Sequence, residues 1–107
     1  MIDSSWFGHM VYFSLRDNSP TAIAKLINGC RLHLSGHPGT VLFAVGTRDP
    51  ELNREVNVKD YDVALQLVFS DRAAHDAYQI HPRHAQFLVE NKDNWATVRV
   101  FDANLSK

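Results

Sequence analysis

The chain has 107 residues, a length typical of one domain with a single modest core. Hydrophobic residues make up 45% of it and charged residues 21%, which argues against a disordered chain or a coiled coil. The formal net charge of −1 provides neither a basic surface for nucleic acid nor a polybasic patch for a membrane, so we expect neither as a partner. The single cysteine and the absence of a basic, apolar leader before Trp6 favour a cytoplasmic protein.

The first half of the chain predicts a strand, a helix and a second strand. Residues of both parities are largely apolar over 6–15, which indicates a strand. Ser19 and Pro20 are typical of a helix N-cap and of a first helical residue. The helix is expected to end near Ser35–Gly36, and its apolar stripe comprises Ile23, Leu26, Ile27, Cys30 and Leu34. A second strand, again apolar on both sides, is predicted over Thr40–Thr47.

The second half begins with a polar loop, Arg48–Asp60, which is predicted to be long and to contain at most a short helical turn. Strict alternation predicts a strand over Tyr61–Phe69. Ser70 or Asp71 is expected to cap a helix that continues through Tyr78.

Pro82 then breaks the helical pattern, because proline disfavours helical geometry in the residue before it. We expect a further helix from Pro82 to Lys92 or Asn94, and a closing strand over Trp95–Asp102.

This order of elements, βαββαβ, indicates an α+β fold of the ferredoxin-like type, with a four-stranded antiparallel sheet and helices on one face. We interpret residues 1–107 as a single domain with its core at about 9–102. A sheet with one solvated face should alternate cleanly, whereas several of these strands are apolar on both parities. We therefore expect a homodimer that packs through the open face of the sheet. A ligand cavity is the competing explanation, and the two are compatible.

One segment concentrates groups that can carry chemistry. Tyr78, His81 and His84 lie within seven residues at the break before Pro82. An imidazole titrates near neutrality and a phenol donates a hydrogen bond, so together they can move a proton to or from a small molecule. The alternative is that these side chains are solvated groups between two helices.

The remaining histidines and the cysteine favour structural roles. His75, His81, His84 and Asp76 could approach a divalent metal, but their spacing matches no closed structural site, and we predict no metal and no cofactor. Asp71 and His75 are more simply a helix-start acid and a surface imidazole. His33 and His37 flank the end of the first helix, and Cys30 falls on its apolar stripe.

Four segments together resemble the stress-responsive α/β-barrel (Dabb) domain family. They are His9–Leu15, Asp62–Phe69 with the following Ser70-Asp71, Tyr78–His84, and Val98–Asp102. The resemblance covers the chain from about His9 to Asp102. It implies a dimeric ferredoxin-like α+β barrel, and most members of that family have no established biochemical activity.

Plant polyketide cyclases within that family carry a Tyr-x-x-His-Pro-x-His arrangement similar to Tyr78–His84. The resemblance implies a cofactor-free reaction in which His84 is the general base and Tyr78 hydrogen-bonds the developing oxyanion. His9 would line the pocket, and we expect His81, Phe13 and Phe87 beside it. The expected ligand is a small hydrophobic, phenolic or polyketone molecule.

Two further readings of the fold class remain. One is a binding or stress-associated dimer without catalysis. The other is a haem- or small-ligand-dependent monooxygenase, with a haem ligand drawn from His9, His75, His81 or His84.

Overall fold

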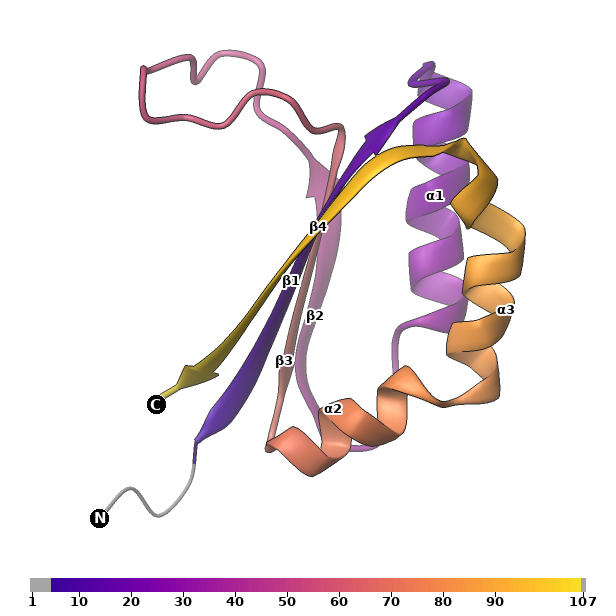
Figure 1. Ribbon diagram of the computed structural model, residues 1–107, viewed down its shortest axis with the longest axis vertical. Coiled ribbons are helices and arrows are strands. Elements are labelled where there is room, and N and C mark those ends of the chain that lie inside the picture. Colours follow the sequence, from indigo (N-terminus) through magenta and orange to yellow (C-terminus); the bar gives the residue numbers. More distant parts are fainter. Residues whose placement is uncertain (1–4, 107) are drawn as a thin grey trace.

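The computed structural model describes residues 5–106. Residues 1–4 and residue 107 lie outside that range. The expectation about a leader before Trp6 therefore falls mostly outside the described residues. The elements follow one another along the chain as shown in Figure 1: β1 (Trp6–Leu15), α1 (Pro20–His33), β2 (Thr40–Thr47), β3 (Val63–Phe69), α2 (Arg72–Gln79), α3 (Pro82–Asn91), a short 3-10 turn η1 (Lys92–Asn94) and β4 (Trp95–Leu105). None of the helices within 5–106 is long and apolar enough to cross a bilayer.

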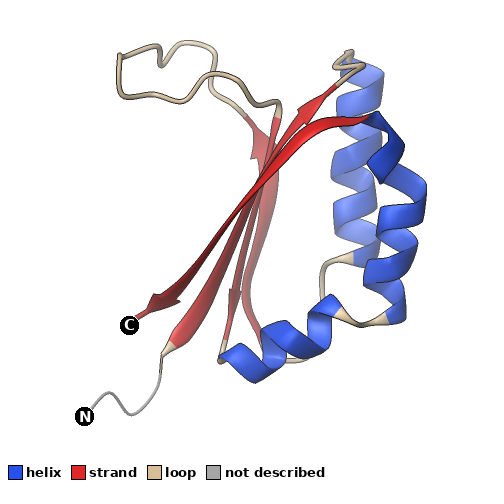
Figure 2. Ribbon diagram, in the orientation of Figure 1, coloured by secondary structure: helices blue, strands red, loops and turns tan. Residues whose placement is uncertain are grey.

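The four strands form one antiparallel sheet in the order β2-β3-β1-β4. All three helices stand on the same side of the sheet, as Figure 2 shows. The α+β ferredoxin-like fold predicted from the order of elements is therefore confirmed. The strands β1 and β3 occupy the centre, while β2 and β4 form the two edges.

Each helix begins where the sequence carries a side chain that can accept from its free amides. The Ser19 hydroxyl accepts a hydrogen bond from the amide of Ala22 at 3.3 Å, and Pro20 occupies the first turn of α1. The Asp71 carboxylate accepts from the Ala74 amide at 2.8 Å. These contacts define the starts of α1 and α2.

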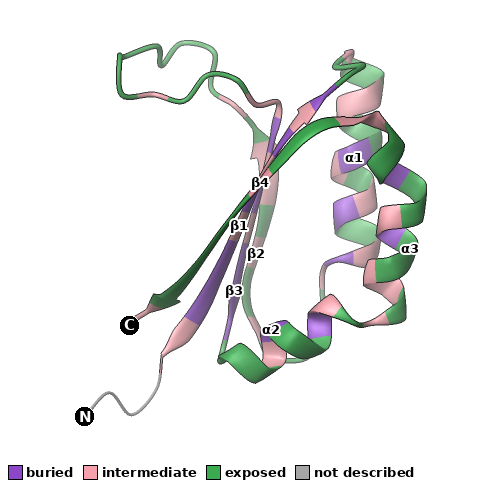
Figure 3. Ribbon diagram, in the orientation of Figure 1, coloured by how far each residue is buried: buried purple, intermediate pink, exposed green. Residues whose placement is uncertain are grey.

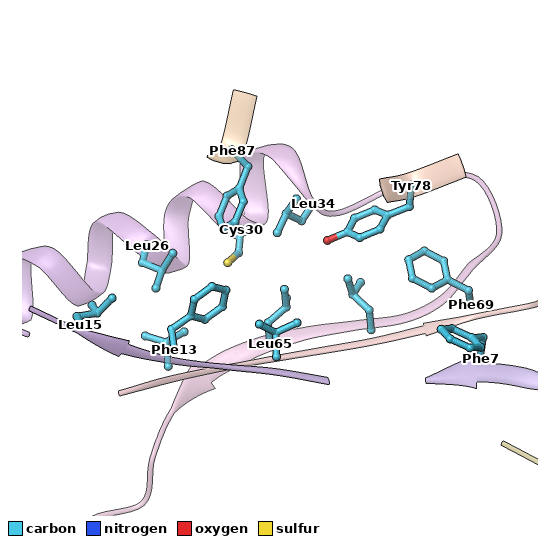
Figure 4. Close-up of a cluster of buried hydrophobic side chains, with 13 residues drawn as sticks. Phe7, Phe13, Leu15, Leu26, Cys30, Leu34, Leu65, Phe69, Tyr78 and Phe87 are labelled. Carbon is cyan, nitrogen blue, oxygen red and sulfur yellow. The ribbon is translucent and has the colours of Figure 1, made fainter. Parts of the chain in front are cut away.

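The core lies between the helices and the sheet, and odd-numbered residues of β1 and β3 form its floor (Figures 3 and 4). Phe13, Val63, Leu65, Leu67 and Phe69 are almost completely buried there. The roof is supplied by three helices, through side chains that include Leu26, Cys30, Leu34, Tyr78 and Phe87. Burial of each large apolar side chain contributes roughly 1.5–3 kcal/mol relative to its exposure.

The opposite face of the sheet is also apolar, but no described helix or strand covers it (Figure 2). Cross-strand partners place Met10 beside Phe101, and Leu42 beside Val68, on this face. Leu42 is 47% exposed and Phe101 is 58% exposed. This open face accounts for the second apolar parity noticed in the sequence.

The observed strand ends differ from the predicted ones at two places. Tyr61 and Asp62 precede β3, which begins at Val63. The Asp62 carboxylate accepts a hydrogen bond from the amide of Leu15 at 2.8 Å, so a side chain takes the place of strand pairing there. The last strand β4 runs on to Leu105, where it pairs with Trp6 of β1. The loop between Thr47 and Val63 contains turns but no helix, and it extends away from the body of the domain in Figure 1.

A close approach at Gly39 fixes the position of α2. Gly39 has a φ of 83°, and a Cβ atom there would lie 2.5 Å from the Cβ of Ala74. The carbonyl of Gly39 also accepts from the Ser70 amide at 2.8 Å. Glycine is therefore required both by the backbone conformation and by the contact with α2.

Candidate functional site

A cavity of about 180 Å³ opens between the helices and the β1–β4 side of the sheet. Its apolar wall includes Phe13, Leu65, Phe87, Trp95, Val98 and Val100. Its polar side chains are His9, Tyr78, Gln79 and His84. Val98 and Val100 belong to the helix-facing side of the edge strand β4, yet they are 37% and 48% exposed, so they mark the mouth of the cavity.

The break between α2 and α3 brings the polar groups together. Tyr78 and Gln79 lie in the last turn of α2, and His84 lies in the first turn of α3. Because Pro82 starts a new helix in a new direction, the ring of His84 meets the ring of Tyr78 edge-on, with centroids 5.0 Å apart and planes at 80°. His9 comes from β1, and its ring centroid is 5.9 Å from that of Tyr78.

Tyr78 is almost completely buried, packed between Phe69 and His37. Figure 4 shows its hydroxyl directed away from α2 into the space between the helices and the sheet. No hydrogen bond among residues 5–106 involves this hydroxyl. Burial, with a smaller contribution from Cys30, raises the pKa of the Tyr78 phenol, so it remains protonated and can donate a hydrogen bond.

His84 is half-buried beside that donor. Burial lowers the pKa of its imidazole, and the neighbouring His9, His37 and His75 lower it further. The ring is therefore neutral at pH 7 and carries a free lone pair. A neutral imidazole of this kind can accept a proton from a bound molecule.

His9 is oriented by a carboxylate on the neighbouring strand. Asp102 is its cross-strand partner, and the Asp102 Oδ1 atom lies 2.5 Å from His9 Nδ1. Burial lowers the pKa of His9 and outweighs the opposing effect of Asp102, so the neutral ring donates its Nδ1–H to the carboxylate. Its Nε2 lone pair then faces the side-chain nitrogen of Gln79 at 3.3 Å.

His75 is the residue for which the sequence-based interpretation is wrong. It was expected to be a surface imidazole, but it is 8% exposed, packs against Phe7 with ring centroids 4.6 Å apart, and lies 4.9 Å from the ring of His9. Helical spacing could have indicated this, since His75 lies three residues before the buried Tyr78 and therefore on the same side of α2.

The other predicted pocket residues divide into two groups. Phe13 and Phe87 lie in the cavity wall, together with His9. His81 does not, because its Nδ1 accepts the amide of Arg83 at 3.0 Å and so turns back to cap α3. The ring of His81 packs on His37 instead, with centroids 4.8 Å apart.

A larger hollow, of about 380 Å³, lies on the open face of the sheet beneath the 48–62 loop. It is lined by Tyr12, Val56, Val58, Arg99 and Phe101, among others, and by no histidine. Despite its size we place the candidate chemistry in the smaller cavity, because that is where neutral imidazoles meet a protonated phenol in apolar surroundings. Such a set can remove a proton from a molecule and stabilise the oxyanion that results.

Comparison with known proteins shows which family the sequence matches. The sequence pattern of the family described as Stress responsive A/B Barrel Domain (Dabb) matches residues 7–105. No curated protein matches the chain.

Solved structures resemble it over nearly its whole length. A dimeric ferredoxin-like protein of unknown function from Thermobifida fusca has a TM-score of 0.78 at 22% identity, covering 98% of this chain and 95% of that one. A Dabb family protein from Mesorhizobium loti has a TM-score of 0.76 at 22% identity, covering 92% and 95%. The hydroxynitrile lyase from Passiflora edulis has a TM-score of 0.77 at 15% identity, covering 95% and 94%. At these identities the likeness shows a shared fold.

Proposed function

We propose that this chain, which belongs to the stress responsive A/B barrel domain (Dabb) family, binds a small, mainly apolar molecule with a carbonyl or phenolic oxygen in the cavity beside Tyr78 and His84. The observation that carries the proposal is the composition of the cavity. Its walls are apolar, and its four polar side chains converge from β1, α2 and α3. Concave, apolar sites with a few convergent polar groups are typical of small-molecule binding.

The size of the cavity limits the ligand. At about 180 Å³ it is smaller than the roughly 300–1,000 Å³ of sites for drug-sized molecules. It is close to the ~150 Å³ cavity that takes up benzene in an engineered protein. We therefore expect a molecule with one ring or a short branched chain, and a haem macrocycle exceeds this space.

The polar groups define how such a ligand would be held. The Tyr78 hydroxyl has no hydrogen-bond partner among the described residues and remains protonated, so a ligand oxygen can accept from it. His84 presents a neutral ring at a neighbouring point of the wall. An oxygen that accepts from Tyr78 and an acidic hydrogen that faces His84 would satisfy both.

The protein would act as a homodimer that packs through the open face of the sheet. Support comes from the exposed apolar side chains of that face, above all Leu42 and Phe101. The similar protein from Thermobifida fusca is itself described as dimeric. A second copy is an economical cover for an apolar sheet face in a chain of this length.

The test is to measure the binding of one-ring phenols, aryl ketones and short β-diketones to the protein. Amide chemical shifts and calorimetry report the binding. Tyr78→Phe and His84→Asn should each weaken the best ligand about 10-fold, the effect of about 1.4 kcal/mol for one lost hydrogen bond. His33→Asn is the matched control, because His33 pairs with Glu90 outside the cavity wall. A panel without a ligand, or equal affinities in all three variants, would contradict the proposal.

A second candidate function is cofactor-free acid–base catalysis in the same cavity. It is favoured by one observation, the pairing of a neutral imidazole with a buried, protonated phenol at 5.0 Å between ring centroids. His84 would remove a proton from a hydroxyl group or from a carbon activated by a carbonyl. Tyr78 would donate a hydrogen bond to the oxygen on which negative charge develops.

Two reactions test this candidate separately from binding. Cleavage of an aromatic hydroxynitrile follows the activity named for the Passiflora edulis enzyme, and aldol closure of a short polyketone follows the chemistry of the plant cyclases. Turnover should fall at least 100-fold in His84→Asn, in line with loss of a general base, while His33→Asn retains it. Binding without turnover would limit the protein to the first function.

A further inference from the structure

Two buried histidines face each other through a single amide group at the end of the sheet near α2. The Gln79 side-chain nitrogen lies 3.3 Å from His9 Nε2 and 3.3 Å from His75 Nε2. The two imidazole rings have centroids 4.9 Å apart. His9 is 5% exposed and His75 is 8% exposed.

The other nitrogen of each ring is held by a carboxylate. His9 Nδ1 lies 2.5 Å from Asp102 Oδ1, and His75 Nδ1 lies 3.0 Å from Asp76 Oδ1. A carboxylate at Nδ1 keeps the proton there and leaves the lone pair on Nε2. Both lone pairs therefore converge on the same point, and carboxylate–histidine pairs of this kind are the usual support of histidines that bind metal ions.

We propose that His9, His75 and Gln79 form a binding site for a divalent transition-metal ion of the zinc class. His9 Nε2 and His75 Nε2 would be the nitrogen ligands. Rotation of the Gln79 amide by half a turn would present its oxygen in place of its nitrogen. With bonds of about 2.0 Å, tetrahedral ligands lie roughly 3.3 Å apart. The Gln79 side-chain nitrogen already lies 3.3 Å from the Nε2 atom of each ring, which is the spacing that such ligands need.

The carboxylates add negative charge beside the site. Metal-binding atoms of His9, His75 and Asp102 all lie within 4.8 Å of one another. Asp76 and Asp102 carry two negative charges beside the two rings, and the nearby Arg72, which binds Asp76 at 2.8 Å, offsets one of them. The side chains of Asp76 and Asp102 are 52% and 43% exposed, so both charges face solvent.

The ligand types decide the kind of cation. Two imidazoles with an amide or carboxylate oxygen suit zinc, cobalt, nickel or copper, whereas magnesium and calcium prefer oxygen alone. The site shares His9 and Gln79 with the cavity wall, but His75 lies outside that wall and neither Tyr78 nor His84 is a ligand. The metal proposal therefore does not depend on the proposed function.

The experiment is a calorimetric titration of chelator-treated protein with Zn²⁺ at pH 7.5, repeated with Co²⁺ followed by visible absorbance. We expect one ion per chain with micromolar affinity or tighter. His75→Phe should weaken binding at least 10-fold and change the Co²⁺ spectrum, while its ring preserves the packing against Phe7 and Phe69. Asp102→Asn, which acts on His9 alone, should weaken binding roughly 10–100-fold.

Gain of affinity provides a second, independent variant. Gln79→Glu replaces the amide by a carboxylate and should bind Zn²⁺ at least 10-fold more tightly than the wild type. His33→Asn and Tyr78→Phe are controls that should bind Zn²⁺ normally. The proposal is overturned if the wild type binds no Zn²⁺, if His75→Phe and Gln79→Glu both bind like the wild type, or if His84→Asn removes binding while His75→Phe does not.

Discussion

The imidazole of His84 meets the phenol ring of Tyr78 edge-on at 5.0 Å, while the Tyr78 hydroxyl has no hydrogen-bond partner among the described residues. A hydroxyl without a hydrogen-bond partner adds no hydrogen bond to the folded state, so its removal should not lower the free energy of unfolding. A substitution that removes this hydroxyl, Tyr78→Phe, should therefore affect ligand binding without affecting folding.

We expect Tyr78→Phe to leave the free energy of unfolding within about 0.5 kcal/mol of wild type, because the ring and its packing on Phe69 are retained. Urea unfolding followed by circular dichroism measures this. A loss of more than about 2 kcal/mol would mean that the hydroxyl is a structural group. Tyr78→Leu, which removes the ring, should cost about 2–4 kcal/mol and serves as the contrast.

Stability should fall as the pH decreases from 7.5 to 5.5. Burial lowers the pKa values of His9, His37 and His84 below the 6.5 of an unfolded histidine. Between the two pKa values the unfolded chain holds more protons than the folded one, so acid favours unfolding. Each such proton changes the free energy of unfolding by at most about 1.4 kcal/mol per pH unit.

Urea unfolding at several pH values between 7.5 and 5.5 measures this slope, in a range where carboxylates stay ionised. His84→Asn removes one of the three groups and should make the slope shallower. A free energy of unfolding that is constant across the range would contradict the lowered pKa values.

Cys30 should resist alkylation in the folded protein. Its side chain is 0% exposed on α1, and burial raises the pKa of the thiol to about 12, so the reactive thiolate is scarce. Mass spectrometry after iodoacetamide treatment at pH 8 should find modification only after denaturant is added. Rapid labelling of the native protein would show that α1 opens locally.

If two copies pack through the open face of the sheet, one charged substitution on that face should separate them. Phe101→Asp places a carboxylate on the apolar face and should convert a dimer, of twice the 12.1 kDa chain mass, into a monomer. Light scattering after size exclusion measures the mass. Val89→Asp is the matched control, because Val89 is 70% exposed on α3, on the other side of the sheet. A monomeric wild type, or a dimeric Phe101→Asp, would exclude this interface.

Local sequence signals were sufficient for the parts of the site that depend on local geometry. A proline after a helical stretch ends one helix and starts the next, so Tyr78 and His84 could be expected to meet across the break. The parity of β1 likewise places His9 on the same side as Val11 and Phe13. These inferences need only the periods of a helix and a strand.

The remaining contacts depend on arrangements that no local pattern encodes. Asp102 reaches His9 because β4 pairs with β1 in one particular register, across 93 residues of sequence. Helical spacing to Tyr78 marks the inward side of α2 for His75, but its contact with the ring of His9 depends on how α2 packs against the sheet. His81 was expected in the cavity wall, but its side chain satisfies a free amide of α3 instead.

The mouth of the cavity lies on an edge strand, and this has a consequence for how the protein can diversify. The strand β4 is hydrogen-bonded to β1 alone, and its Val98 and Val100 border the opening. The acid–base groups come instead from β1, α2 and α3. Mutations at the two valines can therefore alter the size and shape of what enters while the polar groups keep their positions. Descendants of one ancestral chain could therefore differ in what the cavity admits and still keep the same polar groups in its wall.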